Sequence, residues 1–109
     1  MSVLVSLATS FVLSEVAAER NAQDEKWGQQ NHPDGTGGEY RAVMAEMARL
    51  RCQDAARAGA VGWMHILDEE VGEAFAETDS AKLRAELVQV AAVAVAWVEA
   101  IDRRQAVSE

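Results

Sequence analysis

Cysteine, proline and aromatic residues are all scarce in this sequence. Among 109 residues there is one cysteine, Cys52, and one proline, Pro33, and aromatic side chains make up 6% of the chain. A single cysteine excludes an intrachain disulfide and leaves no cysteine pair for a zinc site. Residues that favour helices, such as alanine, glutamate and leucine, are frequent, and runs of β-branched residues are short. The composition therefore predicts an all-α protein.

Basic residues are few as well. The chain has 10 lysines and arginines against 18 aspartates and glutamates, which gives a net charge of −8 and a sequence pI of about 4.7. Such a surface would repel phosphate backbones and anionic lipids, so we expect no nucleic-acid and no membrane partner. The same charge balance is compatible with an acidic cluster that binds a cation.

Long hydrophobic runs are also absent. The apolar segment at residues 3–13 is too short to span a bilayer, and no Lys or Arg precedes it, which argues against a secretory signal. We therefore expect a soluble, cytoplasmic protein. Half of the 109 residues are apolar, which predicts one compact domain over residues 1–109.

Apolar residues recur at helical spacing in four segments, which predicts a four-helix bundle-like domain. The first helix is expected from residue 9 or 10 to residue 27, with Ser10 or Ser14 as its cap and residues 1–9 as an arm or frayed end. Residues 28–39 form a loop, in which Pro33 and the two residues after it favour a turn. The other helices are expected at residues 39–58, 63–77 and 80–104. The short break at residues 78–80 predicts that the last two are antiparallel neighbours.

The last predicted helix is apolar on nearly every side. Between Leu87 and Val98 its only strongly polar side chain is Gln89. A helix of this kind is buried on all sides, and a monomer of four short helices rarely encloses one of them completely. We therefore expect a second subunit on its outer face, in a homodimer or homotetramer. The alternative is a monomer in which the first helix covers that face.

Carboxylates lie within the apolar stripes of the last two predicted helices. On the helix at residues 63–77, Glu70 shares a face with the apolar residues, Glu73 lies at its edge and Glu69 is adjacent. On the helix at residues 80–104, Glu86 again falls among apolar residues, with Gln89 three positions later. Two neighbouring helices would thus direct oxygen-bearing side chains into a shared interior, where a bare carboxylate is costly.

Two kinds of positive charge could neutralise this cluster. One is a basic side chain from a facing helix, for which the candidates are Arg20, Lys26, Arg41 and Arg49. The other is a hard divalent cation, which prefers carboxylate oxygens and retains some of its waters. The spacing alone leaves both open, because acidic residues on helices most often form a solvated face or a salt-bridge network.

The acidic motif resembles that of a known enzyme family. Glu69-Glu70-Val71-Gly72-Glu73, then twelve residues, then Glu86-Leu87-Val88-Gln89 is similar to the E-E-x-x-E … E-x-x-D motif of the MazG-like all-α nucleoside triphosphate pyrophosphohydrolases. The resemblance covers about residues 60–104, and residues 17–35, "AAERNAQDEKWGQQNHPDG", also look like the start of short phage and actinobacterial members. It implies an all-α fold in a dimer or tetramer, with Mg²⁺ or Mn²⁺ held by acidic residues from two antiparallel helices. It also implies hydrolysis of an NTP or dNTP to the monophosphate and pyrophosphate.

Carried over by motif, the resemblance implies that Glu70, Glu73 and Glu86 are metal ligands. Glu69 would be a further ligand or the group that activates water. Gln89 occupies the position of the family's last Asp; its amide oxygen can still coordinate, but it carries no charge and cannot act as a base. The alternative function is therefore a catalytically weak or inactive helical dimer that serves as a nucleotide-binding or protein-interaction module.

Candidate substrate contacts lie outside the acidic motif. Lys26, Lys82 and Arg84 are candidates for phosphate contacts, and the last two lie at the start of a helix, where free amides also favour an anion. Ordinary surface charge is the alternative for each. Trp27, with Gln23, Asn31 and His32, could form a base pocket, because an indole stacks on bases and amides read their edges. The alternative is a helix end followed by a simple turn. We interpret His65 as a surface histidine.

Overall fold

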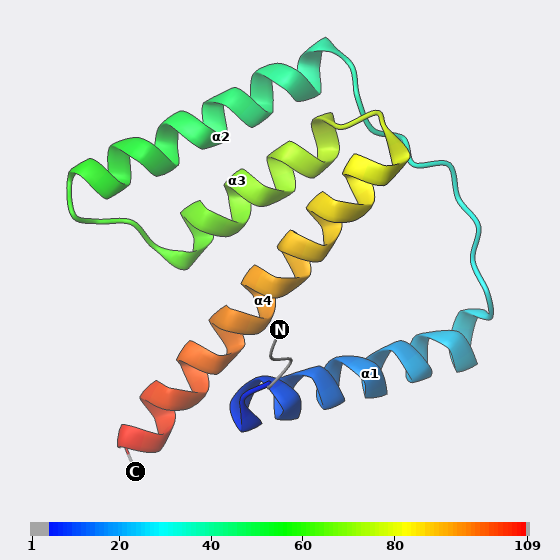
Figure 1. The fold of residues 1–109 in the computed structure, drawn as a ribbon, viewed down its shortest axis with the longest axis vertical. Coiled ribbons are helices and arrows are strands. Elements are labelled where there is room, and N and C mark those ends of the chain that lie inside the picture. The colour runs from blue at the N-terminus through cyan, green and yellow to red at the C-terminus, as the bar shows by residue number, and fades with distance from the viewer. Residues whose placement is uncertain (1–4, 109) are drawn as a thin grey trace. The chain divides into compact units, whose positions relative to one another are not determined.

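The computed structural model describes residues 5–108, with side chains up to residue 106, and over this range it is all-helical (Figure 1). The four helices are α1 (Leu7–Trp27), α2 (Glu39–Arg57), α3 (Trp63–Ala76) and α4 (Ser80–Ser108). No residue in this range is in a β-strand. The predicted all-α class and the order of the four helices are therefore confirmed.

Two helix ends differ from the sequence-based expectation by more than one residue. α1 begins before residue 9, because the Ser6 hydroxyl accepts a hydrogen bond from the backbone N–H of Thr9 at 3.1 Å and caps the first turn. The predicted cap at Ser10 or Ser14 was wrong: Ser14 lies inside the helix, and its hydroxyl donates back to the carbonyl of Ser10. α4 extends past residue 104 to Ser108. The first four residues of the predicted arm lie outside the described range.

The chain divides into two compact units. The first contains residues up to 33 together with residues from 95 onward, and the second contains residues 34–94. In the first unit the described core includes Val12 of α1 and Val95 of α4, and the hydroxyl of Thr9 donates to a carboxylate oxygen of Glu99 at 3.0 Å. The rest of α1 is largely exposed. The single domain expected from chain length stays a prediction.

The second unit is built on close contact between α2 and α3. Gly72 of α3 faces Ala45 of α2, and a Cβ atom at Gly72 would lie 3.2 Å from the Ala45 Cα. Ala48 and Ala74 are 2% and 1% exposed. A residue without a side chain permits this approach of two backbones. In Figure 1, α3 lies between α2 and the first half of α4.

The loop before α2 is fastened to the end of α3. The backbone N–H of Gly37 donates to the carbonyl of Phe75 at 2.8 Å, and the hydroxyl of Thr36 donates to the carbonyl of Glu77 at 2.6 Å. Gly37 has a φ of 91°, and a Cβ there would collide with the Thr78 side chain. Glycine is therefore required at this position, and these contacts keep the end of α3 next to the start of α2.

The outer face of α4 remains exposed within the chain. Leu87 and Val88 are 49% and 55% exposed, so the second unit does not bury all the apolar side chains of this helix. The homodimer or homotetramer expected from this face stays a prediction. Among residues 5–108, none of the helices combines the length and the apolar character needed to cross a bilayer.

Candidate metal centre

α3 begins at a residue pair that fixes its first turn. The backbone N–H of Gly62 donates to Nδ1 of His65 at 2.9 Å. This contact assigns His65 a role in capping the helix, where the sequence indicated only a surface histidine. Seven positions after Trp63, on the face that also carries Ile66 and Leu67, the helix presents Glu70. All four of these side chains are partly buried.

Three carboxylates from α3 and α4 converge in the second unit. Glu70, Glu73 and Glu86 each offer one oxygen, and these three oxygens all lie within 4.8 Å of one another. Each of the three residues is partly buried. Oε2 of Glu70 and Oε2 of Glu86 are buried atoms without a hydrogen-bond partner. Buried polar atoms in folded proteins normally have a partner, so this pair calls for a physical explanation.

The surroundings of the cluster oppose ionisation of Glu70 and Glu73. Burial raises the pKa of Glu70 above the ordinary value for a glutamate, and the nearby carboxylates of Glu86 and Glu69 raise it further. Burial also raises the pKa of Glu73, with Glu70 and Glu86 adding to the effect. None of the ion pairs between described residues includes a carboxylate of this cluster.

The four basic residues considered as neutralising partners have other neighbours. Within the second unit, the Arg49 guanidinium pairs with Glu46 on its own helix, and the Arg41 guanidinium lies over the rings of Tyr40 and Phe75 at 5.3 and 5.2 Å from their centroids. In the first unit, Arg20 pairs with Asp24 at 2.8 Å, and the Lys26 amine lies 4.8 Å from the centre of the Trp27 ring.

The donor set fits a hard divalent cation. Mg²⁺ and Ca²⁺ take oxygen ligands at about 2.0–2.6 Å, so two ligands on opposite sides of one ion are separated by about 4–5 Å. The three glutamate oxygens lie within that span. An ion would also provide the missing partner for the two buried oxygens of Glu70 and Glu86. The chemistry of the three residues is therefore that of a carboxylate site for a divalent cation.

Glu69 faces a different neighbour. Its carboxylate accepts a hydrogen bond from the thiol of Cys52 on α2, and this contact is the main reason why the pKa of Cys52 is raised. Glu69 is not among the three residues whose oxygens converge, although its charge adds to the raised pKa values of Glu70 and Glu73. Gln89 is exposed on α4, three residues after Glu86.

Lys82 and Arg84 are both exposed at the start of α4 but differ in direction. Lys82 is four residues before Glu86 and shares its face, whereas Arg84 is two residues before it and points to the other side. The expected anion site at the helix start is already occupied. The backbone N–H of Lys82 donates to the Asp79 carboxylate at 2.9 Å, and the N–H groups of Thr78 and Asp79 donate to the Glu77 carboxylate at 3.1 and 3.0 Å.

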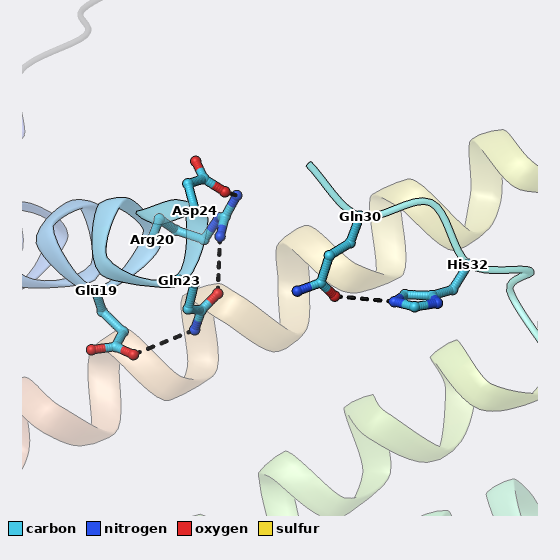
Figure 2. A network of polar contacts seen from close by, with 6 residues as sticks. All are labelled: Glu19, Arg20, Gln23, Asp24, Gln30 and His32. Carbon is cyan, nitrogen blue, oxygen red and sulfur yellow. Dashed lines mark hydrogen bonds and ion pairs between the residues drawn. The ribbon is translucent and has the colours of Figure 1, made fainter. Parts of the chain in front are cut away.

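The other candidate substrate residues, Lys26, Trp27, Asn31 and His32, belong to the first unit. Figure 2 shows the polar network beside them: the Arg20 guanidinium contacts Gln23 and Asp24, Gln23 contacts Glu19, and His32 lies 3.0 Å from Gln30. Trp27 is the last residue of α1 and is 62% exposed.

Two hollows lie along this part of the chain. One, of about 600 Å³, is lined by Arg20, Gln23, Asp24, Gly28, Gln29 and Gln30. The other, of about 470 Å³, is lined by Glu19, Ala22, Gln23, Lys26, Trp27 and Gln30. Asn31 and His32 line neither of them. Gln30, which lines both, was not expected from the sequence; the amide-rich run after Gly28 was the available signal.

Comparisons of the whole chain with protein-family models, with curated proteins and with solved structures find no match. The candidate site is defined by its own geometry. The structure brings Glu70, Glu73 and Glu86 together, places Glu69 toward α2, and leaves Gln89, Lys82 and Arg84 exposed on α4.

Proposed function

We propose that this protein is a Mg²⁺-dependent nucleoside triphosphate pyrophosphohydrolase, which converts an NTP or dNTP and water to the monophosphate and pyrophosphate. The observation that carries the proposal is the convergence of three carboxylate oxygens from two antiparallel helices, two of whose side chains contain buried, unpartnered oxygens. Mn²⁺ is an alternative ion. The proposal also draws on the resemblance of residues 69–73 and 86–89 to the motif of the MazG-like enzymes.

Glu70, Glu73 and Glu86 would hold the ion. When bound, Mg²⁺ supplies charge neutralisation for the triphosphate and lowers the pKa of a coordinated water. Phosphoryl transfer depends mainly on positioning and electrostatic stabilisation, for which the closely packed α2 and α3 provide a firm base. Lys82, on the same face of α4 as Glu86, is the better placed of the two basic residues to contact a phosphate.

Glu69 is the candidate general base. It is next to Glu70 in sequence, but its carboxylate is engaged with Cys52 and is not part of the converging set. A carboxylate outside the ligand set can accept a proton from water, whereas one that binds the ion has fewer free lone pairs. Gln89 cannot take this role, because an amide is not a base at neutral pH.

Gln89 favours a second candidate function. With an amide where the resembling family has a carboxylate, the site has one negative charge fewer and would hold a second ion less firmly. The protein would then be a weak or inactive helical module that binds a nucleotide or a protein partner. A Gln89→Asp variant separates the two: a large gain of activity would indicate a degenerate site in the natural sequence, and little change would indicate that three glutamates suffice.

The direct test is pyrophosphate release from a panel of NTPs and dNTPs with Mg²⁺ or Mn²⁺. We expect turnover of at least one nucleotide, and loss of turnover when the metal is chelated. Glu73→Gln should abolish turnover, whereas Glu46→Gln, which removes an exposed carboxylate on α2, should leave it unchanged. If no nucleotide is hydrolysed with either metal at high protein concentration, the enzyme proposal fails.

A further inference from the structure

We infer that the end of α1 and residues 28–30 form a nucleobase site that binds a base without metal or phosphate. This inference goes beyond the proposed function, because it concerns a separate ligand site within the first unit. Its structural basis is independent of the acidic cluster, because every residue involved lies in the first unit.

The two hollows have the volume of a small-molecule site, and the residues that line them are exposed. Their volumes, about 600 and 470 Å³, lie in the range of about 300–1,000 Å³ in which ligand pockets are usually found. Gln23 and Gln30 line both hollows and therefore join them. The Trp27 indole forms part of the wall of one. A large flat ring beside amide groups is the combination that stacks on a heterocycle and bonds to its edge.

The charges of this region select a neutral ligand. The carboxylates of Glu19 and Asp24 offset the positive side chains of Arg20 and Lys26, so the lining carries no net charge. Arg20 is already bonded to Asp24 and Gln23 (Figure 2). A triphosphate would find little attraction here, whereas an uncharged base can use the amides and the second oxygen of each carboxylate.

The network also orients the amides. The Gln23 carbonyl oxygen accepts from Arg20 at 2.9 Å, and the Gln30 carbonyl oxygen lies 3.0 Å from Nε2 of His32. In Figure 2 the amide nitrogen of Gln30 points toward α1, leaving a donor directed at the space between the two segments. His32 is thus a positioning residue for Gln30. Lys26 lies over one face of the indole, which leaves the other face for the base.

The test uses nucleosides, which have no phosphate, and the full chain in the presence of a chelator. Calorimetric titration with adenosine, guanosine, cytidine, uridine and thymidine should show binding of at least one of them. Trp27→Leu should weaken that binding at least about fivefold, in line with the usual contribution of one base–aromatic stack. His32→Ala should weaken it less than Gln30→Leu does.

The matched control is Tyr40→Leu, which removes an equally exposed aromatic ring from α2: Tyr40 is 66% exposed and Trp27 62%. It should leave nucleoside binding unchanged. The inference is overturned if no nucleoside binds, or if Tyr40→Leu and Trp27→Leu have the same effect. Nucleoside binding by a protein that hydrolyses no triphosphate would support the base site while removing the proposed enzyme activity, so the two can fail separately.

Discussion

The two polar regions of this protein balance their charges in opposite ways. Beside the end of α1, acidic and basic side chains alternate, and Arg20 contacts both Gln23 and Asp24 within its own helix. In the second unit, Glu70, Glu73 and Glu86 gather like charges in a partly buried position, and two of their oxygens lack a hydrogen-bond partner. The first region balances its charges within the chain, whereas the second needs a cation or added protons to balance its charges.

The largest effect is expected from the second region. Glu86→Gln should reduce pyrophosphate release about 100-fold or more, because it removes one ligand and leaves an amide in the cluster. The same variant should be at least as stable as the natural protein without metal, since a repulsive charge has been removed. Thermal melting with and without Mg²⁺ checks this: the natural protein should gain melting temperature from Mg²⁺ and the variant should not. An equal gain in both would contradict a metal centre at these residues.

The second-largest effect is expected from a packing change that weakens metal binding but not nucleoside binding. Gly72→Leu would force a side chain into the 3.2 Å approach to Ala45, and overpacking of this kind costs about 1–3 kcal/mol of unfolding free energy. Metal binding should weaken with it, because α3 carries Glu70 and Glu73. Nucleoside binding at the end of α1 should persist wherever the variant remains folded. Denaturant unfolding gives the stability, with Ala85→Leu on the exposed side of α4 as control.

A pH series should produce a smaller effect. The pKa values of Glu70 and Glu73 are raised in the folded protein above the ordinary 4.5. A carboxyl whose folded pKa is raised contributes stability below its unfolded pKa and loses that contribution as the pH rises through the folded pKa. Without metal, the melting temperature should therefore fall as the pH is raised from about 4.5 through the folded pKa values, and Mg²⁺ should reduce this fall. Glu70→Gln combined with Glu73→Gln should flatten the curve; an unchanged curve would show that the fall has another origin.

The smallest effect is expected in the first region. Arg20→Gln removes an exposed ion pair with Asp24, in which both side chains are more than half exposed. Exposed pairs four residues apart on a helix contribute about 0.3–0.5 kcal/mol, so the unfolding free energy should change by no more than that, and less at high salt. A loss above about 1 kcal/mol would show that this network is structural after all.

The helices and the acidic cluster could be predicted from the sequence, for physical reasons specific to each. The 3.6-residue period fixes which residues of α3 share a face, so the position of Glu70 among apolar side chains followed from spacing alone. The short break before Ser80 predicted that α3 and α4 are neighbours, which is the condition for Glu86 to meet Glu70.

Other features depended on tertiary contacts that a single sequence does not encode. The cap of α1 could not be chosen among several serines, and Ser6 was overlooked because apolar residues surround it. The capping role of His65 depends on the conformation of Gly62. The contact between Glu69 and Cys52 depends on how α2 and α3 approach each other at Gly72. The geometry of the three carboxylates supports ion binding, and the experiments above test it.

The hydrogen bond between Glu69 and Cys52 gives the protein an internal chemical reporter. Thiols react with alkylating reagents as thiolates, and the contact with Glu69 keeps the proton on Cys52. Any event that draws the Glu69 carboxylate away from α2 would release that proton more easily and speed up labelling. The rate at which Cys52 is alkylated would therefore show, without any variant, whether Glu69 contacts Cys52 or acts at the metal centre.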